Sequence, residues 1–342
     1  AREGSPAAPE ALAAQLLATA ATASRTGREL EENLGRLARL GIEVPGTEAL
    51  FRRLSESLPD WGVPVNPDAD ETIGPAGRGS VVGAMRRIVT LSPDSAEGAR
   101  RFREMVSTAI EQLNSGNLGR AVTMFGLAEQ IIRKERVEKQ VAQAIRDRAH
   151  ESIDAAKVRA FAEKPENHAA LRSVLGFFPA LRPEGLLDAL REERKRDARR
   201  HFLALLEVHG EPARTAALER IATELSDSAA GSDWYFLRNL LYVLRRVPRP
   251  DGAPLEAEID HLFRLSELDR PAPLVKEAFS NLAQTRHERA EQVLIARLSQ
   301  LESALAKAGP AGSSDLPQLL DRACAALARQ GTPAALRAIV EH

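Results

Sequence analysis

The stretch RNLLYVL, residues 238–244, decides the fold, because its basic residue is followed by apolar residues three and six positions later. Three other segments of the second half repeat this arrangement, and successive basic residues lie 39, 38 and 46 positions apart. The four sets are Arg199 with Phe202 and Leu205, Arg238 with Leu241 and Leu244, Lys276 with Phe279 and Leu282, and Arg322 with Ala325 and Ala328. A period of about 40 residues is typical of a two-helix repeat, in which each hairpin leaves an apolar face for its neighbour to cover. The pattern therefore predicts an α-solenoid of antiparallel helix pairs, a fold that usually binds other macromolecules.

The composition of the 342 residues also favours helices. Hydrophobic residues make up 44% of the chain and aromatic residues only 4%, while Ala, Leu, Arg and Glu dominate. Such a mixture supports a substantial core but lacks the β-branched and aromatic residues that strands prefer. Lys and Arg number 47 against 48 Asp and Glu, which excludes a global field that attracts nucleic acid or acidic lipid and leaves room for a local patch.

The single cysteine, Cys324, excludes an intramolecular disulfide and fits a reducing compartment. No apolar run approaches the roughly 18 residues of a membrane span, and the Ala-rich N-terminus lacks the basic and apolar regions of a signal peptide. We therefore expect a cytoplasmic protein without a membrane span. The chain begins at Ala1 rather than Met, so we also expect the natural protein to be longer.

Proline and glycine divide the chain into four predicted regions. Residues 1–59 read as an N-terminal helical segment, and residues 60–79 as a Pro/Gly-rich loop or linker. Residues 80–164 are expected to hold a helical hairpin at 99–132 and one long charged helix at 133–161, and residues 165–342 the repeat array. In the hairpin, a turn at Gly116 is followed by small Ala121 and then Phe125, a pattern that resembles the tetratricopeptide repeat.

The array itself resembles bacterial HEAT-repeat proteins over residues 167–342. The resemblance rests on Asp188-Ala189-Leu190 followed by Asp197-Ala198-Arg199-Arg200, and on the stretch DWYFLRNLL at 233–241. It implies an interaction surface rather than a reaction. It also implies hydrogen bonds between Asp and Arg of successive repeats. This chain departs from that pattern, because Asp197, Asp233 and Asp321 lie at different offsets from their basic residues.

One helical stripe is the best candidate for a partner contact. Tyr235, Arg238, Tyr242 and Arg245 follow the i, i+3, i+4, i+7 spacing of one helix face, and tyrosine and arginine dominate the hot spots of interfaces. The alternative is packing between repeats, which we favour for Trp234. A solvent-facing stripe would bind another protein.

A second candidate is a basic cluster made of Arg191, Arg194, Lys195, Arg196, Arg199 and Arg200. It is suited to phosphates or to an acidic partner. The alternative, which we favour, is a solvated corner between helices that Glu192, Glu193 and Asp197 partly neutralise. A smaller cluster of Arg245, Arg246 and Arg249 would lie near the first if neighbouring repeats align them.

No set of residues matches a catalytic, metal or cofactor motif. The seven histidines lack ligand spacing, residues 74–79 lack the Gly-Lys-Ser/Thr ending of a phosphate loop, and Cys324 reads as a core residue. The leading hypothesis is a non-enzymatic bacterial scaffold that binds another protein and needs no cofactor. Nucleic-acid binding through residues 191–200 is the alternative, and an enzyme that uses unrecognised residues is a third. The sequence leaves the oligomeric state open.

Overall fold

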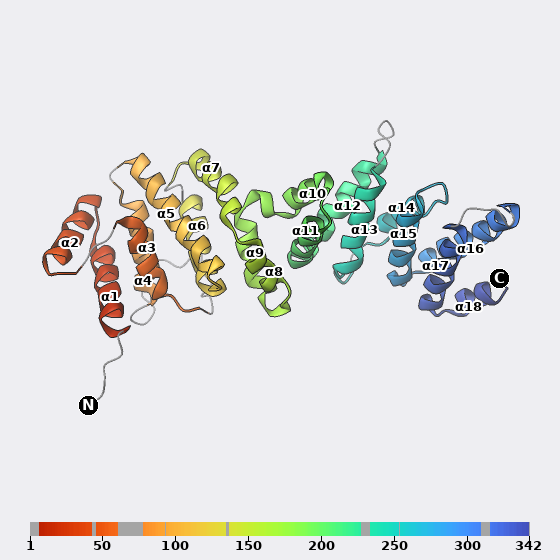
Figure 1. Ribbon diagram of the computed structural model, residues 1–342, viewed down its shortest axis with the longest axis horizontal. Coiled ribbons are helices and arrows are strands. Elements are labelled where there is room, and N and C mark those ends of the chain that lie inside the picture. The colour runs from red at the N-terminus through yellow and green to blue at the C-terminus, as the bar shows by residue number, and fades with distance from the viewer. Residues whose placement is uncertain are drawn as a thin grey trace, which may run out of the picture. The chain divides into compact units, whose positions relative to one another are not determined.

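The computed structural model describes residues 7–42, 46–60, 78–92, 94–134, 137–226, 233–252, 254–308 and 315–341. Within these ranges the chain forms eighteen α-helices and three short 3-10 helices, and it contains no strand (Figure 1). The all-α prediction is confirmed. The predicted loop at 60–79 lies, apart from its ends, outside the described residues.

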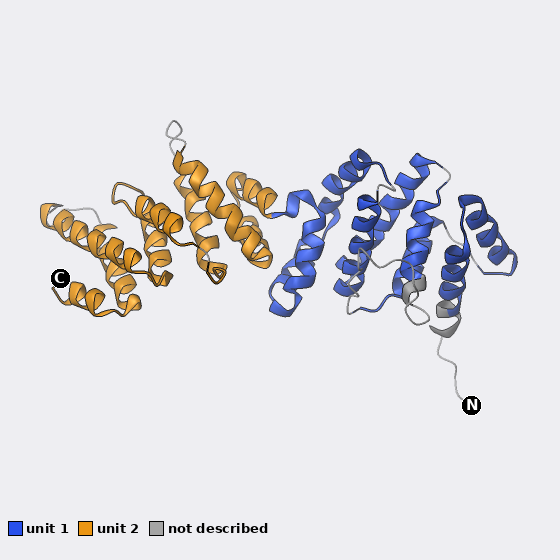
Figure 2. Ribbon diagram, turned by 180° about the vertical axis from the view of Figure 1, so that it is seen from behind, with its two compact units in different colours: residues 1–182 blue, residues 183–342 orange. Residues whose placement is uncertain are grey.

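Contacts between helices divide the chain into two compact units, residues 1–182 and residues 183–342 (Figure 2). The first is called unit 1 and the second unit 2. Unit 1 contains α1 (Ala7–Ala23), α2 (Gly27–Arg39), α3 (Thr47–Glu56), α4 (Arg78–Thr90), α5 (Ser95–Asn114), α6 (Leu118–Arg133), α7 (Lys139–Ala149), α8 (Ala155–Ala162) and α9 (His168–Phe177). Unit 2 contains α10 (Pro183–Glu192), α11 (Arg196–His209), α12 (Glu211–Ser226), α13 (Trp234–Arg246), α14 (Glu256–Leu265), α15 (Ala272–Gln284), α16 (Glu288–Ala308), α17 (Asp315–Gln330) and α18 (Pro333–Glu341).

The core of unit 1 is built where α5, α6 and α9 pack together. Phe125 of α6 meets the adjacent rings of Phe177 and Phe178, with all three pairs of ring centroids 5.0 to 5.2 Å apart and every ring buried. Helices α5 and α6 form the predicted hairpin, and Gly116 makes its turn with a φ of 94°, a left-handed conformation that glycine adopts without strain.

The prediction of one long helix over 133–161 is wrong. The structure ends α7 at Ala149, continues with a 3-10 turn at His150–Ser152, and begins α8 at Ala155. Asp154 caps α8 by accepting the N–H groups of Ala156 and Lys157. Asn114 of α5 donates to the Ser152 carbonyl and accepts the Asp154 N–H, both at 2.9 Å. These contacts hold the chain between the two helices in a non-helical conformation that local helix propensity does not foresee.

The helices of unit 2 contact one another in two rows. One row follows the order α11, α13, α15, α17, and the other follows α10, α12, α14, α16, α18; in each row every helix packs against the next. The four basic residues of the repeated arrangement all lie in the first row. The second row joins the first through contacts such as α12 with α13 and α16 with α17.

Three of the four repeated sets face the core as their spacing predicts. Leu205, Leu241, Leu244, Phe279 and Leu282 are buried, and Phe202 is half-buried. The prediction for the fourth set is wrong, because its two alanines lie on the exposed face of α17 and not on the buried one. Ala325 and Ala328 are exposed, and the buried stripe of α17 runs instead through Leu319, Ala323, Ala326 and Leu327. A segment with many alanines permits several phases, because alanine is compatible with either face of a helix.

Polar side chains link successive helices within each row. In the row of α12, α14 and α16, Arg264 donates to the Leu225 carbonyl at 2.7 Å, and Arg297 donates to the Phe263 carbonyl at 2.9 Å. In the other row the donors are amides: Asn281 reaches the Leu241 carbonyl, and Gln330 reaches the carbonyls of Leu282 and Thr285. These acceptors lie in the last turn or just beyond the end of their helices, except Leu241. The carbonyls of Phe263, Leu282 and Thr285 also accept a backbone N–H of the following residues, so the links add a second donor to them.

Aspartate–arginine links between repeats also occur, one of them at Asp188, but none is found at Asp197, Asp233 or Asp321 within the described residues. Arg220 of α12 pairs with Asp188 of α10 at 2.5 Å, and Arg289 of α16 pairs with Asp260 of α14. Asp233 instead caps its own helix. The offsets of Asp197, Asp233 and Asp321 therefore do not mark the pairs that join the helices.

Candidate functional site

The candidate site begins with the cap of α13. The Asp233 side chain accepts the N–H groups of Tyr235 and Phe236, at 3.1 and 3.2 Å, which fixes where the helix starts. Phe236 and Leu237 then point into the core. Tyr235, Arg238, Tyr242 and Arg245 are all half-buried, so the predicted stripe lies along the border between the core and the solvent.

Tyr235 brings the two candidate sites together. The Arg238 Cζ lies 4.4 Å from the centroid of the Tyr235 ring, and the Arg199 Cζ lies 4.8 Å from the same centroid. Arg199 belongs to α11 and to the basic cluster, whereas Tyr235 and Arg238 belong to the stripe on α13. Each guanidinium lies within the range of a cation–π contact, so two helices of one row meet through a tyrosine and two arginines. The ring of Trp234 lies edge-on to Tyr235, 5.4 Å away.

The two arginines over Tyr235 differ in their hydrogen bonds. Arg199 Nη1 donates to the carbonyls of Glu193 and Arg194, at 3.1 and 2.6 Å, just beyond the end of α10. Arg238 has no hydrogen-bond acceptor or carboxylate partner among the described residues. Its guanidinium is therefore held in place by a ring and keeps its donors available.

The other end of the stripe is neutralised within the protein. Arg245 pairs with Glu277 of α15 at 2.6 Å, and Arg246 pairs with Glu207 of α11 at 3.1 Å. Arg245 also lies over the ring of Tyr242, 5.3 Å from its centroid. Burial, together with the negative charge of Glu207, raises the pKa of the Tyr242 hydroxyl above its ordinary value. At the C-terminal end of α13 the arginines are thus ion-paired with neighbouring helices and do not form an open basic surface.

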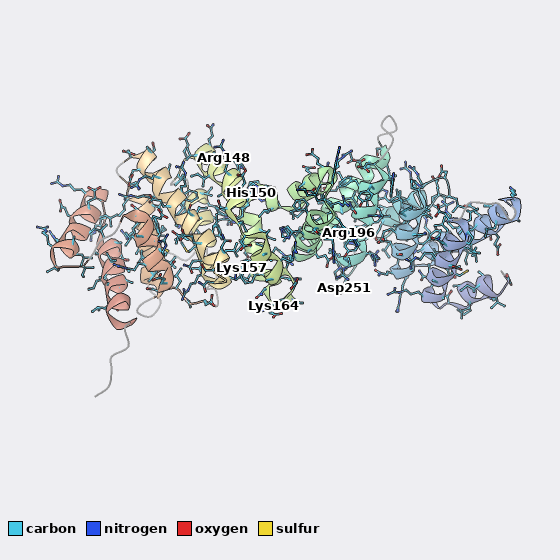
Figure 3. All side chains as sticks on the ribbon, viewed as in Figure 1. Arg148, His150, Lys157, Lys164, Arg196 and Asp251 are labelled. Carbon is cyan, nitrogen blue, oxygen red and sulfur yellow. The ribbon has the colours of Figure 1, made fainter. Side chains whose placement is uncertain are left out.

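The basic cluster contains paired and unpaired members. Arg191 pairs with Glu224 of α12 at 2.8 Å and lies over the ring of Phe236. Arg196 is the first residue of α11 (Figure 3). The cluster's exposed side chains that have no acidic partner within the described ranges are Arg194, Lys195, Arg196 and Arg200. Glu193 does not neutralise them by an ion pair, since its carboxylate accepts the backbone N–H of Lys195.

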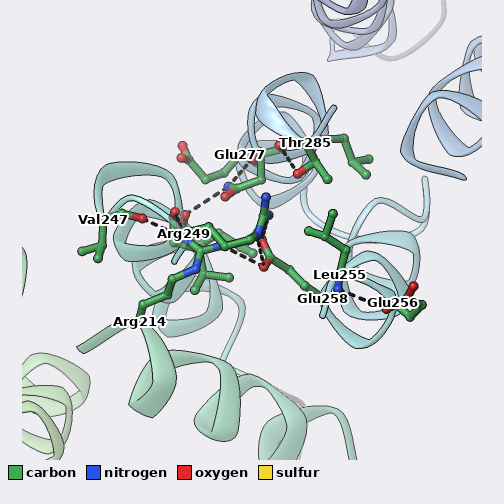
Figure 4. Close-up of polar contacts among 12 residues, drawn as sticks. Arg214, Val247, Arg249, Leu255, Glu256, Glu258, Glu277 and Thr285 are labelled. Atoms are coloured by element: carbon green, nitrogen blue, oxygen red, sulfur yellow. Dashed lines mark hydrogen bonds and ion pairs between the residues drawn. The ribbon is translucent and has the colours of Figure 1, made fainter. Parts of the chain in front are cut away.

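The three arginines of the smaller cluster reach three different helices, and Arg245 pairs with α15. Arg246 reaches α11 through Glu207, which partly meets the expectation that the two basic clusters lie near each other. Arg249 turns away from them and pairs with Glu258 at 2.8 Å (Figure 4). Glu258 also holds Arg214, so one carboxylate receives two guanidinium groups in the interior of unit 2.

Sequence patterns did not single out Arg214, Glu258, Glu207 or Glu277. No motif surrounds the three glutamates, and each meets an arginine on another helix. Arg214 carries a readable signal, because it lies in a stripe of buried alanines, Ala213, Ala216 and Ala217. An arginine within an apolar stripe indicates a buried charge that needs a partner.

The remaining candidates have ordinary environments. Cys324 is half-buried, and burial raises the pKa of its thiol. Within the described ranges, no group of three or more His, Cys, Asp and Glu side chains is arranged to hold a metal ion. The search of the described helices for one both long and apolar enough to cross a membrane finds none.

Comparison with models of known protein families gives no match to this chain. A search of curated proteins likewise finds no similar sequence.

Proposed function

We propose that this chain is a non-enzymatic adaptor that binds another protein through the surface formed by α11 and α13. We call this region the Tyr235 surface and define it by Arg196, Arg199, Arg200, Tyr235 and Arg238. In the same proposal, unit 2 is a HEAT-like α-solenoid, α5 and α6 form a tetratricopeptide-like hairpin, and the protein works in the bacterial cytoplasm. The two rows of helices in unit 2 and the period of the repeated arrangement support the solenoid.

The observation that carries the proposal is the placement of two guanidinium groups over one tyrosine ring. Arg199 and Arg238 come from different helices, and Arg238 has no acceptor among the described residues. A rigid aromatic side chain with oriented arginines is what interface hot spots are made of, because little conformational entropy is lost when a partner binds.

Site-specific photocrosslinking in the cells that make the protein tests this proposal. A benzoylphenylalanine at Asp197, an exposed residue of α11 one turn from Arg200, is expected to crosslink one discrete protein. The double variant Tyr235→Ala, Arg238→Ala should abolish that product. A benzoylphenylalanine at Ser299, an exposed position on α16, serves as the matched control and should not give it. The same products from both positions, or no protein product from Asp197, would show that the proposal is wrong.

One observation favours nucleic-acid binding as a second candidate. Arg194, Lys195, Arg196 and Arg200 are exposed and lack acidic partners among the described residues. If they contact phosphates, affinity for duplex or single-stranded DNA falls linearly on a logarithmic salt scale, with a slope set by the number of phosphates contacted. Failure to bind either form of DNA in low salt would eliminate this candidate.

A further inference from the structure

We infer that the Tyr235 surface takes a short acidic peptide segment of its partner, and that Arg238 binds a carboxylate of that segment through two parallel N–H groups. This inference rests on the proposed function and names the chemistry of the partner. It follows from three features of the surface: a guanidinium that lies beside a ring and has no acceptor among the described residues, further cations next to it, and acidic side chains that bound it.

The guanidinium beside a ring is that of Arg238. A guanidinium presents its donors in a planar fork that matches the two oxygens of a carboxylate. The buried and half-buried arginines nearby already use theirs: Arg214 on Glu258, Arg245 on Glu277, and Arg199 on two carbonyls of the chain. Arg238 is held by the Tyr235 ring instead, 4.4 Å from its centroid. The ring therefore places the Arg238 guanidinium without using its N–H donors.

Cations beside Arg238 extend the site onto α11. Arg196, Arg199 and Arg200 share one face of that helix, since they lie three and four positions apart. Arg199 touches the same ring as Arg238, which places this face next to Tyr235. Asp233 and Glu193 keep their charge but accept backbone N–H groups, and over residues 194–200 five basic side chains outnumber the one carboxylate, that of Asp197. A segment with several carboxylates thus meets several cations in succession.

Acidic side chains limit the length of the positive surface. Tyr242, one turn beyond Arg238 on α13, lies beside Glu207. Arg245, two turns beyond Arg238, is paired with Glu277. A long polyanion that continues along α13 would meet these two carboxylates. The Tyr235 ring is also a poor platform for base stacking, because it already lies under two guanidinium groups. Both features favour a short acidic peptide over a nucleic acid.

Fluorescence anisotropy on the full chain tests the inference with defined probes. The probes are a labelled ten-residue peptide with four Glu residues in a Gly/Ser sequence, the same peptide with Gln at those positions, and a labelled single-stranded 20-nucleotide DNA. At low salt the Glu peptide is expected to bind and the Gln peptide to bind at least about tenfold more weakly. No binding of the Glu peptide, or equal binding of the Gln peptide, would overturn the inference.

Two arginine-to-lysine variants test whether the planar donors of Arg238, and not only its positive charge, determine the affinity for the Glu peptide. Arg238→Lys keeps the positive charge but loses the planar donors, and it should weaken the Glu peptide about tenfold. Arg245→Lys is the matched control on the same stripe, because Arg245 is already occupied by Glu277, and it should leave affinity within about twofold. Circular dichroism should show the same helix content for both variants. Unchanged affinity in Arg238→Lys, or tighter binding of the DNA than of the Glu peptide, would contradict the inference.

The proposed function and this inference can fail separately. A protein crosslinked from position 197 whose contacting segment carries no cluster of Asp or Glu would refute the acidic segment and leave the adaptor function standing. No protein product from position 197 would refute the adaptor function itself.

Discussion

Arg214 and Glu258 form a buried ion pair between α12 and α14. Arg214 Nη2 lies 2.7 Å from both carboxylate oxygens of Glu258, and each side chain is only 5% exposed (Figure 4). Arg214 Nη1 also donates to the carbonyls of Leu244 and Val247 at the end of α13. One arginine therefore joins three successive helices, and Arg249 adds a second cation to the same carboxylate.

Removal of the carboxylate should destabilise unit 2 strongly. In Glu258→Gln, the buried Arg214 keeps its charge but loses its anionic partner, a change that typically costs about 3 to 5 kcal/mol. Urea unfolding followed by circular dichroism measures the loss, and hydrogen exchange should locate it in α12, α13 and α14. Asp260→Asn breaks the exposed pair with Arg289 and is the control, with an expected loss below about 1 kcal/mol. Equal midpoints for the two variants would mean that the buried pair does not stabilise the unit.

Glu97 should make the stability of unit 1 depend on acid. Its hydrogen bonds to Arg100 and Arg101 outweigh its burial and lower the pKa of the Glu97 carboxyl from 4.5 to about 2. Because the folded pKa lies below the unfolded one, the stabilisation is fully present above about pH 4.5 and is lost as the pH falls toward 2. Arg101 also donates to the Ile88 carbonyl of α4, so the loss should loosen the contact of α5 with α4.

The measurement is the midpoint of urea unfolding at several pH values between 2 and 5. In Glu97→Gln the carboxyl no longer titrates, so the free energy of unfolding should fall less steeply with acid than in the wild type. The two proteins should differ most at pH 5 and converge near pH 2. Parallel pH profiles would show that another carboxylate accounts for the acid dependence.

The sequence was sufficient to predict the helices because their ends carry local signals. Pro and Gly lie between most of them, and Asp233 caps α13. Two failures have tertiary causes. The break in the expected helix at 133–161 depends on Asn114, which lies on another helix. The phase of α17 was ambiguous because alanines occupy both faces.

The candidate site was predictable in its residues and not in its contacts. Helical spacing grouped Tyr235 with Arg238, and those two side chains do touch. The contact of Arg199 with Tyr235 depends on how α11 and α13 rotate against each other, which no local pattern encodes. The same holds for Glu277, which pairs with Arg245 of the stripe, and for Glu207, which pairs with the neighbouring Arg246.

Replacement of Arg297 by lysine should destabilise unit 2. It is buried, and its guanidinium donates at once to the Ser266 hydroxyl, the Gln300 side chain and the Phe263 carbonyl, at 3.2, 2.7 and 2.9 Å. Lysine keeps the charge but cannot span these acceptors, so the end of α14 would lose donors at a cost of about 1 to 3 kcal/mol. Urea unfolding of Arg297→Lys measures this. Arg289→Lys, at an exposed arginine of the same helix, should change little, and a similar loss in both variants would contradict the role of the Arg297 fork.

Tyr242 should ionise at unusually high pH, and the chain allows a direct test because it has only two tyrosines. In Tyr235→Phe, the tyrosinate absorbance near 295 nm reports Tyr242 alone. Burial and Glu207 raise its pKa above 10.0, so the midpoint should lie above pH 10. Because the folded pKa exceeds the unfolded one, the associated stability is present below pH 10 and is lost as the pH rises through the folded pKa. Adding Glu207→Gln removes the second cause and should lower the midpoint. A midpoint at or below pH 10 in Tyr235→Phe would show that Tyr242 is not partly buried beside Glu207 as described.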